Sequence, residues 1–497
     1  MNPLFKDLFI FEMANNHQGD VNHGLAIIRE MGKLQRKYNI NAAVKFQYRQ
    51  LDTFIHPDFR HDKEAKHISR FLSTELSLND YYTMVQATRE EGLVTVCTPF
   101  DEESVDIILK HGIEIIKVAS CSADDWPLLQ KIATAGKPVI ASTGGLLMPQ
   151  IDNLVSFMRH RSLDFAVLHC VGIYPSPDEV QHLNFIEKLI RRFPDVTIGY
   201  SGHEAPDNTD VAKVAIAKGA RILERHVGLP TDTVKLNAYS MNPEQVDQWI
   251  AATLQARVIC GNHEKSVTQA EMDSLLSLKR GVFARHNLKE GQEIEASDVF
   301  FAMPCQPGQL TSGEFGRYRA RWKTTRDYKA KEAVFETNPP DLYTQIRGII
   351  HQAKGLFTEA GIVLGENYEV ELSHHYGLEN FAATGCLIVT VMNREYCKKL
   401  IVVLPGQSNP MHKHKKKEET FQLLHGDLQA ILEEEQYNLK PGDQLLVKRD
   451  TWHSFRSVNG AIFEEISTTH YRNDSFYADE KIAALDPMQR KTVLEEF

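Results

Sequence analysis

Residues 113–145 read IEIIKVASCSADDWPLLQKIATAGKPVIASTGG, in which two short β-rich runs, Ile113–Val118 and Val139–Ala141, stand on either side of a longer stretch. A strand, a long connection and a second strand are the pattern of a βα unit with parallel strands. The same alternation continues in both directions. The candidate strands are Leu8–Met13, Ala42–Phe46, Leu93–Cys97, Ile113–Val118, Val139–Ala141, Phe165–His169, Thr197–Tyr200 and Ala220–Glu224. Eight such units in about 250 residues predict an α/β fold, a closed (β/α)8 TIM barrel, over residues 1–265.

The rest of the chain follows a different pattern. Short apolar runs between turn signals predict a small β-rich domain over residues 280–337. The proline pair Pro339-Pro340 then interrupts the chain, because proline cannot continue a helix. We expect a helical connector over 338–365, with Tyr343–Ala360 as its helix. From 366 to 497, alternating strands and glycine turns predict an all-β barrel or sandwich with a C-terminal tail.

Composition narrows the class of protein. The chain has 497 residues, with 56 Lys and Arg against 66 Asp and Glu, and a formal net charge of -10. This balance gives no basic surface for nucleic acid or for an anionic membrane. The N-terminus lacks the pattern of a signal peptide, and no window approaches the ~18 to 20 apolar residues of a membrane span. Seven scattered cysteines without a CxxC pair indicate reduced core thiols. We therefore expect a cytoplasmic protein that acts on small molecules.

The carboxyl ends of the predicted barrel strands, where TIM-barrel chemistry takes place, carry polar residues. In chain order these are Glu12, Lys45 with Gln47, Thr98, Lys117 with Ser120, Ser142, Tyr174 after His169, Ser201 with His203, and Glu224 with His226. Two lysines among several hydroxyls suit a ligand with a phosphate and a carboxylate. His203 and His226 can share one divalent metal ion, although a pair of histidines also commonly serves structure alone.

Several of these stretches resemble the motifs of the sialic acid synthase family, over residues 5 to 336. They are FEMANNHQGD, AAVKFQ, VCTPFD, IKVAS, KPVIASTGG, VLHCVGIYPSP, IGYSGHE and ILERHV. The resemblance implies condensation of phosphoenolpyruvate with an aldose to give a 2-keto-3-deoxy sugar acid. It also implies Glu12, Lys45, Lys117 and Tyr174 as catalytic residues.

The resemblance further implies the binding groups. Phosphoenolpyruvate would contact Lys45, Thr98, Lys117, Ser120, Ser142, Tyr174 and Ser201; the acceptor would contact Gln47, Phe100 and Asn237; and Mn²⁺ or Mg²⁺ would bind His203 and His226. The small domain at 280–337 resembles the antifreeze-like (SAF) domain of these synthases. That likeness implies a homodimer in which each SAF domain covers the barrel mouth of the other subunit.

Three positions depart from the family pattern. Ser122 stands where the family has a glutamate, Gly172 stands where it has an asparagine, and an arginine of the SAF domain is replaced around Met303. All three belong to the acceptor end of the site. We therefore expect an acceptor other than N-acetylmannosamine, such as a non-acetylated aldose.

A second group of candidate ligands lies in the C-terminal part. The segment from Gly406 to Gly426 matches G-x5-HxH-x4-E-x6-G, the first metal motif of the cupin family. Residues two apart in a strand share a face, so His412 and His414 point the same way, with Glu419 and His453 completing the set. We expect a divalent transition metal there, Zn²⁺, Mn²⁺ or Fe²⁺.

Two questions of function stay open at this point. The cupin segment resembles the D-lyxose isomerase-like sugar isomerases, so it is either an isomerase that supplies the acceptor or a non-catalytic sugar sensor. The function of the barrel also has two alternative interpretations. One is a Schiff-base aldolase with Lys45 or Lys117 as the imine-forming lysine, and the other is a non-catalytic sugar-binding protein.

Overall fold

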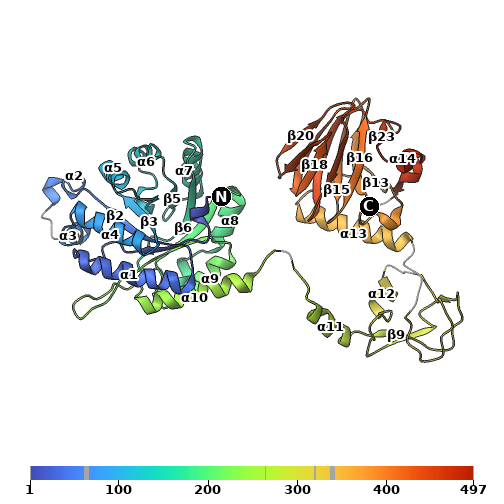
Figure 1. Cartoon of the computed structure of the whole chain (residues 1–497), viewed down its shortest axis with the longest axis horizontal. Helices are drawn as coiled ribbons and strands as arrows, with labels where there is room; N and C mark the ends of the chain where they lie inside the picture. Colours follow the sequence, from blue (N-terminus) through green and yellow to red (C-terminus); the bar gives the residue numbers. More distant parts are fainter. Residues whose placement is uncertain (1, 61–65, 264, 318–320, 336–341, 496) are drawn as a thin grey trace. The chain divides into compact units, whose positions relative to one another are not determined.

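A computed structural model describes residues 2–60, 66–263, 265–317, 321–335, 342–495 and 497 (Figure 1). The chain forms two compact units, Met1–Lys265 and Ser266–Phe497, and each is described by itself. The predicted boundary at 337 and 338, with the pair Pro339-Pro340, lies outside the described residues.

The first unit is a closed barrel of eight parallel strands in chain order, which confirms the TIM-barrel prediction. Its strands are β1 (Phe9–Glu12), β2 (Ala42–Tyr48), β3 (Val94–Pro99), β4 (Ile115–Val118), β5 (Val139–Ser142), β6 (Phe165–Cys170), β7 (Thr197–Gly202) and β8 (Ile222–His226). β1 closes the barrel by pairing with both β2 and β8. Glu12 consequently stands beside Lys45 on one side and His226 on the other.

The helices of this unit are α1 (Val21–Tyr38), α2 (Leu51–Phe54), α3 (Lys66–Ser73), α4 (Leu78–Glu90), α5 (Glu102–Lys110), α6 (Trp126–Ala133), α7 (Met148–His160), α8 (Asn184–Arg192), α9 (Asp210–Ala217) and α10 (Pro243–Cys260). Most of them cover the outside of the barrel, and two short ones, α2 and α3, lie in the connection between β2 and α4 (Figure 1). α1 shows how the sequence sets their bounds. Asp20 caps its first turn with a side-chain hydrogen bond, and Asn39 ends it in the left-handed conformation. Its buried face presents Ile27, Ile28 and Met31 to the barrel.

Alternating positions along the strands build two layers inside the barrel. The lower layer is apolar and fully buried, and includes Ile10, Ala43, Val96, Ile115, Ile140, Ala166, Leu168 and Ile222. Successive side chains of a strand point to opposite faces, so the residue two positions further on also points inward. In most strands that next residue is polar, namely Glu12, Lys45, Thr98, Lys117, Ser142 and Glu224. The site therefore rests on a closed apolar floor.

The second unit begins with α11 (Gln269–Leu278) and a small β-rich part. Here β9 (Gly281–Ala284) pairs with β11 (Val299–Ala302), and β10 (Glu293–Ile294) pairs with β12 (Trp322–Lys323). Together with α12, at residues 312–316, these strands enclose an apolar core of their own. A small β-rich module is thus present, whereas its identity as an antifreeze-like domain stays a prediction.

The remainder is an antiparallel two-sheet β domain, as predicted for a cupin. Its strands are β13 (Glu369–Ser373), β14 (Cys386–Asn393), β15 (Tyr396–Val403), β16 (Ser408–His414), β17 (Glu419–Gly426), β18 (Leu428–Leu432), β19 (Glu435–Leu439), β20 (Gln444–Val447), β21 (His453–Arg456), β22 (Ala461–Thr468), β23 (Ser475–Tyr477) and β24 (Lys491–Leu494), with the short α14 (Glu480–Ala483). One sheet has the order β20-β17-β22-β15-β14-β13-β24, and the other β19-β18-β21-β16-β23.

The helix that was expected as a connector, α13 (Leu342–Glu359), belongs to the core of this β domain. Its Ala353 and Phe357 pack in one apolar cluster with Leu372 and Leu387 of the larger sheet. The helix is therefore held by burial of an apolar face and does more than join two domains.

The cysteine prediction is only partly right. All seven cysteines are free and five of them are buried, but Cys121 and Cys260 are exposed, so these two are not core thiols.

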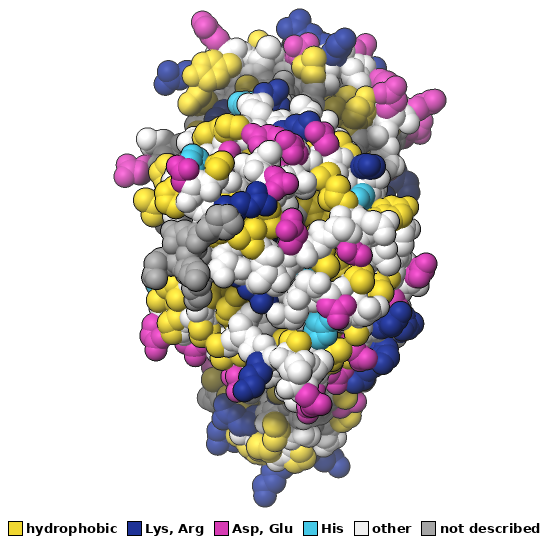
Figure 2. Space-filling model, turned by 90° about the vertical axis from the view of Figure 1, so that its left-hand side faces the viewer, with side chains coloured by type: hydrophobic (Ala, Val, Ile, Leu, Met, Phe, Trp, Pro, Cys, Tyr) yellow, Lys and Arg dark blue, Asp and Glu magenta, His cyan; other side chains and the backbone are white. Residues whose placement is uncertain are grey.

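The face drawn in Figure 2 carries acidic, basic and hydrophobic side chains intermingled, and neither sign of charge forms a continuous patch on it. Across the described ranges, no helix combines the length and the apolar character needed to cross a bilayer.

Candidate functional site

Lys45 is the centre of a buried ion network at the carboxyl ends of the barrel strands. Its ammonium lies 2.5 Å from a carboxylate oxygen of Glu12 and 2.8 Å from one of Glu224. The other oxygen of Glu12 accepts the backbone N–H of Ala14 at 2.7 Å, which fixes the carboxylate in place. None of the three charged side chains is more than 6% exposed. The network thus holds one cation between two carboxylates, out of water.

These neighbours shift the pKa values in different directions. Burial opposes the charge on Lys45, but Glu12 and Glu224 outweigh it and raise its pKa. Burial raises the pKa of Glu12 against the opposing effect of Lys45. Burial also tends to raise the pKa of Glu224, but the positive charges of Lys117 and Lys45 outweigh it and lower this pKa to about 2. Glu224 is therefore a permanent carboxylate, and Glu12 is the one that takes up a proton more readily.

Lys117 on β4 is the second buried lysine. Its ammonium donates to Ser142 Oγ at 2.6 Å and to the Val118 carbonyl at 3.0 Å, and it lies 3.8 Å from Glu224. Burial lowers the pKa of Lys117 to about 8, although Glu224 acts in the opposite direction. At neutral pH Lys117 is thus a cation with a loosely held proton.

The predicted hydroxyl residues surround these lysines. Ser201 on β7 donates to Glu224 at 2.8 Å. Ser120, in the turn after β4, accepts the backbone N–H of Gly144 at 2.9 Å and so ties this turn to the one after β5. The buried hydroxyl of Thr98 has no hydrogen-bond partner in the part of the chain that is described. An unpaired buried hydroxyl costs about 1–3 kcal/mol, so Thr98 is suited to bind a ligand atom.

His203 and His226 lie next to each other at the end of β7 and β8, with ring centroids 5.5 Å apart. Nδ1 of His203 donates to the Val171 carbonyl at 2.9 Å, which leaves Nε2 with a free lone pair. Burial is the main cause that lowers the pKa of each ring, to about 3, so both are neutral imidazoles, the form that coordinates metals. Among the described residues, no third His, Cys, Asp or Glu completes a metal cluster with them.

Aromatic rings line this histidine pair. The Tyr174 ring, on the loop after β6, has its centroid 4.1 Å from that of His203. Tyr239 lies 5.2 Å from Tyr174 and 5.0 Å from His226. Tyr239 was not predicted, because its loop after β8 gave no sequence signal of its direction.

The predicted acceptor-side residues differ in what they contact. Gln47 donates to Glu12 at 3.4 Å and so joins the ion network. Phe100 lies under the guanidinium of Arg49, at 3.7 Å. Asn237 is exposed, and its amide oxygen accepts the backbone N–H of Tyr239. Within the described chain, no contact joins the Asn237 side chain to the other predicted site residues.

Arg49 is a site residue that the sequence analysis missed. Its guanidinium lies over the rings of Phe100 and Phe71, at 3.7 and 4.1 Å, and donates to Gln47 at 2.8 Å. Its Nε is buried without a hydrogen-bond partner among the described residues. Burial lowers the pKa of Arg49 to about 10, which leaves it cationic at neutral pH. The signal was alternation, since Lys45, Gln47 and Arg49 share one face of an extended chain.

Ser122 occupies the position where the family has a glutamate, and the neighbouring acidic residues do not take the place of that carboxylate. Ser122 is buried, whereas Asp124 and Asp125 are exposed, and Asp125 caps α6 by accepting the backbone N–H of Leu128. The carboxylate that contacts both lysines is Glu224. The sequence placed Glu224 at a strand end without giving it a role.

In the β domain, His412 and His414 of β16 and His453 of β21 form a cluster whose ligand atoms lie within 4.8 Å of one another. Glu419, at the start of β17, has one oxygen 3.6 Å from His414 Nε2 and the other 3.2 Å from His453 Nε2. Glu419 also pairs with the ammonium of Lys417. The four predicted ligands are thus brought together, and all are buried.

The orientation of these rings suits a metal ion. Each histidine donates its Nδ1 proton to a backbone carbonyl, those of Pro410, Asp474 and Thr451 in turn, at 2.9, 2.7 and 3.0 Å. The Nε2 atoms are then free to coordinate. Burial is the largest cause that lowers the pKa of His412 and His414, to about 4 for His414. Glu419 Oε2 and His453 Nε2 also lack hydrogen-bond partners in the described part of the domain.

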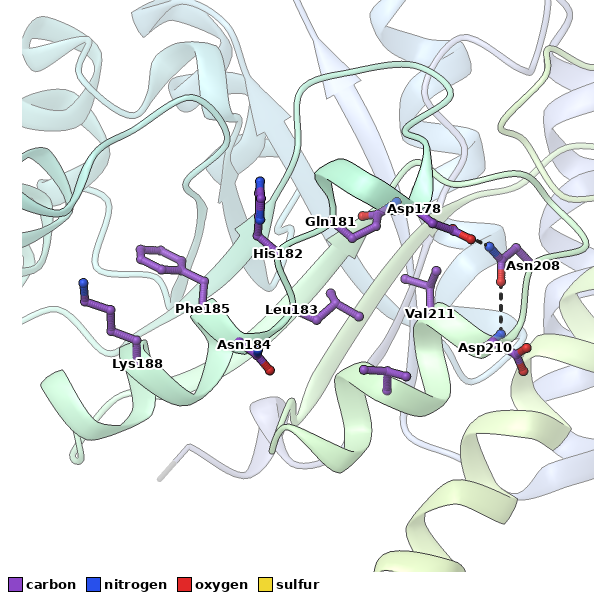
Figure 3. A pocket seen from close by; sticks show the side chains of 11 residues that line it. Asp178, Gln181, His182, Leu183, Asn184, Phe185, Lys188, Asn208, Asp210 and Val211 are labelled. Atoms are coloured by element: carbon purple, nitrogen blue, oxygen red, sulfur yellow. Dashed lines mark hydrogen bonds between the residues drawn. The ribbon is translucent and has the colours of Figure 1, made fainter.

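A groove of about 770 Å³ lies on the outside of the barrel between α8 and α9 (Figure 3). Asp178 accepts from Asn208 at 2.8 Å at one end, and His182, Phe185 and Lys188 lie toward the other. None of the predicted site residues lines this groove. Volume alone does not supply converging polar groups, so we place the chemistry at the strand ends.

A family model described as the NeuB family matches residues 38–265, and a cupin domain model matches residues 399–464. A crystal structure of a putative spore coat polysaccharide biosynthesis protein E from Chromobacterium violaceum is 46% identical, has a TM-score of 0.64, and covers 67% of this chain and 99% of that chain. The chain belongs to the NeuB family.

Two enzymes are similar to this NeuB family chain at lower identity. One is the N-acetylneuraminate-9-phosphate synthase of Drosophila melanogaster, 27% identical over 340 residues, 62% of this chain and 89% of that protein. The other is the N,N'-diacetyllegionaminic acid synthase of Legionella pneumophila, 26% identical over 309 residues, 59% of this chain and 85% of that protein. NeuB membership and the cupin match confirm the two family resemblances predicted from the strand-end and HxH motifs.

Proposed function

We propose that the barrel joins phosphoenolpyruvate to the aldehyde of an aldose, releasing phosphate and forming a 2-keto-3-deoxy sugar acid. The observation that carries this proposal is the pair of buried lysines, Lys45 and Lys117, at the strand ends of a NeuB family barrel. The similar enzymes named as synthases of N-acetylneuraminate 9-phosphate and N,N'-diacetyllegionaminic acid support it.

In this reaction C3 of phosphoenolpyruvate attacks the aldehyde carbon, water adds at C2, and phosphate leaves. Lys45 and Lys117 hold the phosphate and the carboxylate of the substrate by charge. The hydroxyls of Thr98, Ser120, Ser142, Tyr174 and Ser201 add oriented hydrogen bonds. Glu12 positions or deprotonates the water, a role that its burial-raised pKa favours.

Mn²⁺ or Mg²⁺ fits His203 and His226, because both rings are neutral and a backbone carbonyl already uses Nδ1 of His203. Such an ion, when bound, supplies Lewis acidity at the acceptor carbonyl. Tyr174 packs on the His203 ring and orients it.

At the acceptor end we propose that Gln47, Phe100 and Asn237 meet the sugar, with Arg49 as a further contact. The missing carboxylate at Ser122 supports an acceptor other than N-acetylmannosamine. A homodimer in which each antifreeze-like domain covers the other subunit's barrel mouth belongs to the same proposal.

In the cupin domain we propose a divalent ion, Zn²⁺, Mn²⁺ or Fe²⁺, on His412, His414, His453 and Glu419. A second candidate function is isomerisation of the acceptor sugar. The pair of Lys417 and Glu465, neither of which is a proposed ligand, favours it over a sensor, since an acid and a base beside a metal suit proton transfer between two carbons.

The proposal is tested by phosphate release from phosphoenolpyruvate. The full chain is incubated with Mn²⁺ or Mg²⁺ and a panel of aldoses from tetroses to heptoses, and the product mass is measured. One aldose should give stoichiometric phosphate and a keto acid, and Lys117→Met should abolish both. If no aldose of the panel triggers phosphate release, the proposal is wrong.

Borohydride trapping with pyruvate tests the alternative that the barrel is a Schiff-base aldolase, for which the lowered pKa of Lys117 would be suitable. A covalent adduct on Lys45 or Lys117 supports that aldolase, whereas phosphate release excludes the non-catalytic reading as well.

A further inference from the structure

The cupin domain holds a cavity of about 90 Å³ that includes His412 and His414 of the metal cluster. Residues of both sheets line it, and many of them are ionisable: Glu371, His375, Lys399, Lys417, Glu419, Glu465, His470, Arg472, Arg490 and Lys491. A single water needs roughly 10–15 Å³ on this measure, so the cavity has room for several waters or one small polyol.

The inner charges of this cavity balance one another. Lys417 pairs with Glu419 and lies 2.9 Å from Glu465, and Lys399 lies 3.3 Å from Glu465. Two ammonium groups therefore face two carboxylates. This inner network carries no surplus that would attract a charged ligand.

The rim is different, because it carries unpaired arginines. Lys491 pairs with Glu371 at 3.0 Å, but neither Arg472 nor Arg490 has a carboxylate partner among the residues that the structure describes. Arg490 is half-buried, and its guanidinium lies 4.7 Å from the ring centroid of Tyr477. The rim therefore has a surplus of positive charge.

One aromatic ring links this rim to the metal cluster. The Tyr477 ring, which lies under the guanidinium of Arg490, also stacks on the His412 ring, with ring centroids 5.6 Å apart. A ligand of a few carbon atoms can therefore reach the histidines with one end and the guanidinium groups with the other.

Two buried polar atoms in the cavity wall also lack partners in the described part of the chain. They are Nδ1 of His375, which is 1% exposed, and Oδ1 of Asn409. Nε2 of His375 is already bonded to the Tyr477 hydroxyl at 3.0 Å. An unpaired Asn409 oxygen is a natural acceptor for a ligand hydroxyl.

We propose that this cavity binds an anionic sugar. Its polyhydroxy end lies against His412, His375 and Asn409, and its phosphate or carboxylate lies against Arg472 and Arg490. Guanidinium groups bind both oxoanions through paired N–H donors. The inference adds a ligand charge to the proposed metal site and requires no turnover by the cupin.

The test is calorimetric titration of the metal-loaded full chain with glucose 6-phosphate, gluconate and glucose as probes. At least one anion should bind about tenfold or more tightly than glucose. The double variant Arg472→Gln, Arg490→Gln should lose about tenfold or more of that affinity, and glucose binding should not change. The barrel is intact in every sample, so only the component that this variant loses is assigned to the cupin.

The matched control is Arg449→Gln, an exposed arginine of the same domain that does not line the cavity, and it should bind as the parent does. Arg472→Lys with Arg490→Lys should lose less affinity than the glutamine double variant, because the charges are kept and only the paired N–H donors are lost. The stronger of the two anions identifies the source as phosphate or carboxylate.

Metal content and melting temperature are measured on every sample. Loss of metal in His414→Ala with anion affinity retained would separate the metal proposal from this one. Equal binding of glucose and both anions, no binding of either anion, or an unchanged affinity in the glutamine double variant overturns the proposal.

Discussion

If the proposed reaction is right, Lys117 should set a pH limit on the use of phosphoenolpyruvate. Its pKa, lowered by burial to about 8, means that it loses its proton as the pH rises through that value, and with it the attraction for an anion. We expect kcat/KM for phosphoenolpyruvate to be level between about pH 6.5 and 7.5 and to fall by up to about tenfold per unit above 8, because kcat/KM reports the free enzyme. Steady-state kinetics over this range measures it.

Lys117→Arg is the control for that assignment. A guanidinium keeps its charge throughout the range, so the fall above pH 8 should vanish even where the overall rate is reduced. The same alkaline fall in this variant would show that another group causes it.

Arg49 should contribute to binding of the acceptor aldose and not to binding of phosphoenolpyruvate. Its planar guanidinium is held by Phe71, Phe100 and Gln47, and lysine cannot reproduce that stacking. We expect Arg49→Lys to raise KM for the acceptor aldose by about tenfold or more and to change KM for phosphoenolpyruvate less than about twofold. A larger effect on phosphoenolpyruvate would place Arg49 at the other end of the site.

The sequence predicts which side chains of a strand point into the barrel, but it does not predict where side chains point after the strand has ended. Lys45 and Lys117 follow from the order of strands, since inward positions alternate and the carboxyl ends share one face. Arg49 lies one residue past β2, where alternation puts it on the face of Lys45 and Gln47, but no local pattern encodes its contact with Phe71 of α3. Tyr239 lies in a loop and was missed for the same reason.

At the scale of elements, strand β7 leaves no room for a side chain at Gly199. A Cβ there would lie 2.5 Å from the carbonyl oxygen of Ile222 in β8 and 2.5 Å from Leu168 of β6. We expect Gly199→Ala to lower the free energy of unfolding by about 1–3 kcal/mol, measured by urea denaturation of the purified chain. Gly172→Ala is the control, because a Cβ there meets nothing within 4 Å. Equal stability of the two variants would contradict this packing argument.

The role of α13 illustrates what periodicity leaves open. The spacing of apolar residues over Tyr343–Ala360 predicted a helix, and the helix is present as Leu342–Glu359. Its partner could not be predicted, because the cluster that buries Phe357 is completed by Leu372 and Leu387 from strands later in the chain. Amphipathicity reports that a face is buried and does not report against what.

At the scale of the whole molecule, the two proposed metal sites should fail independently, since each lies within its own compact unit. His414→Ala should lower the tightly bound transition metal from about one ion per chain toward none, and should leave phosphate release by the barrel within about twofold of the parent. Elemental analysis and the phosphate assay check both. His425→Ala, a cupin histidine outside the cavity lining, is the control. Parallel loss of phosphate release would mean that the units are coupled.

Four of the candidate metal ligands, His203, His412, His414 and His453, give their Nδ1 proton to a carbonyl of the main chain. A peptide carbonyl is present whatever residue carries it, so no single substitution at the supporting position deletes the acceptor. The coordinating tautomer is therefore insulated from sequence drift around each site. Side chains around each site can therefore be replaced without changing which nitrogen of each imidazole is left free.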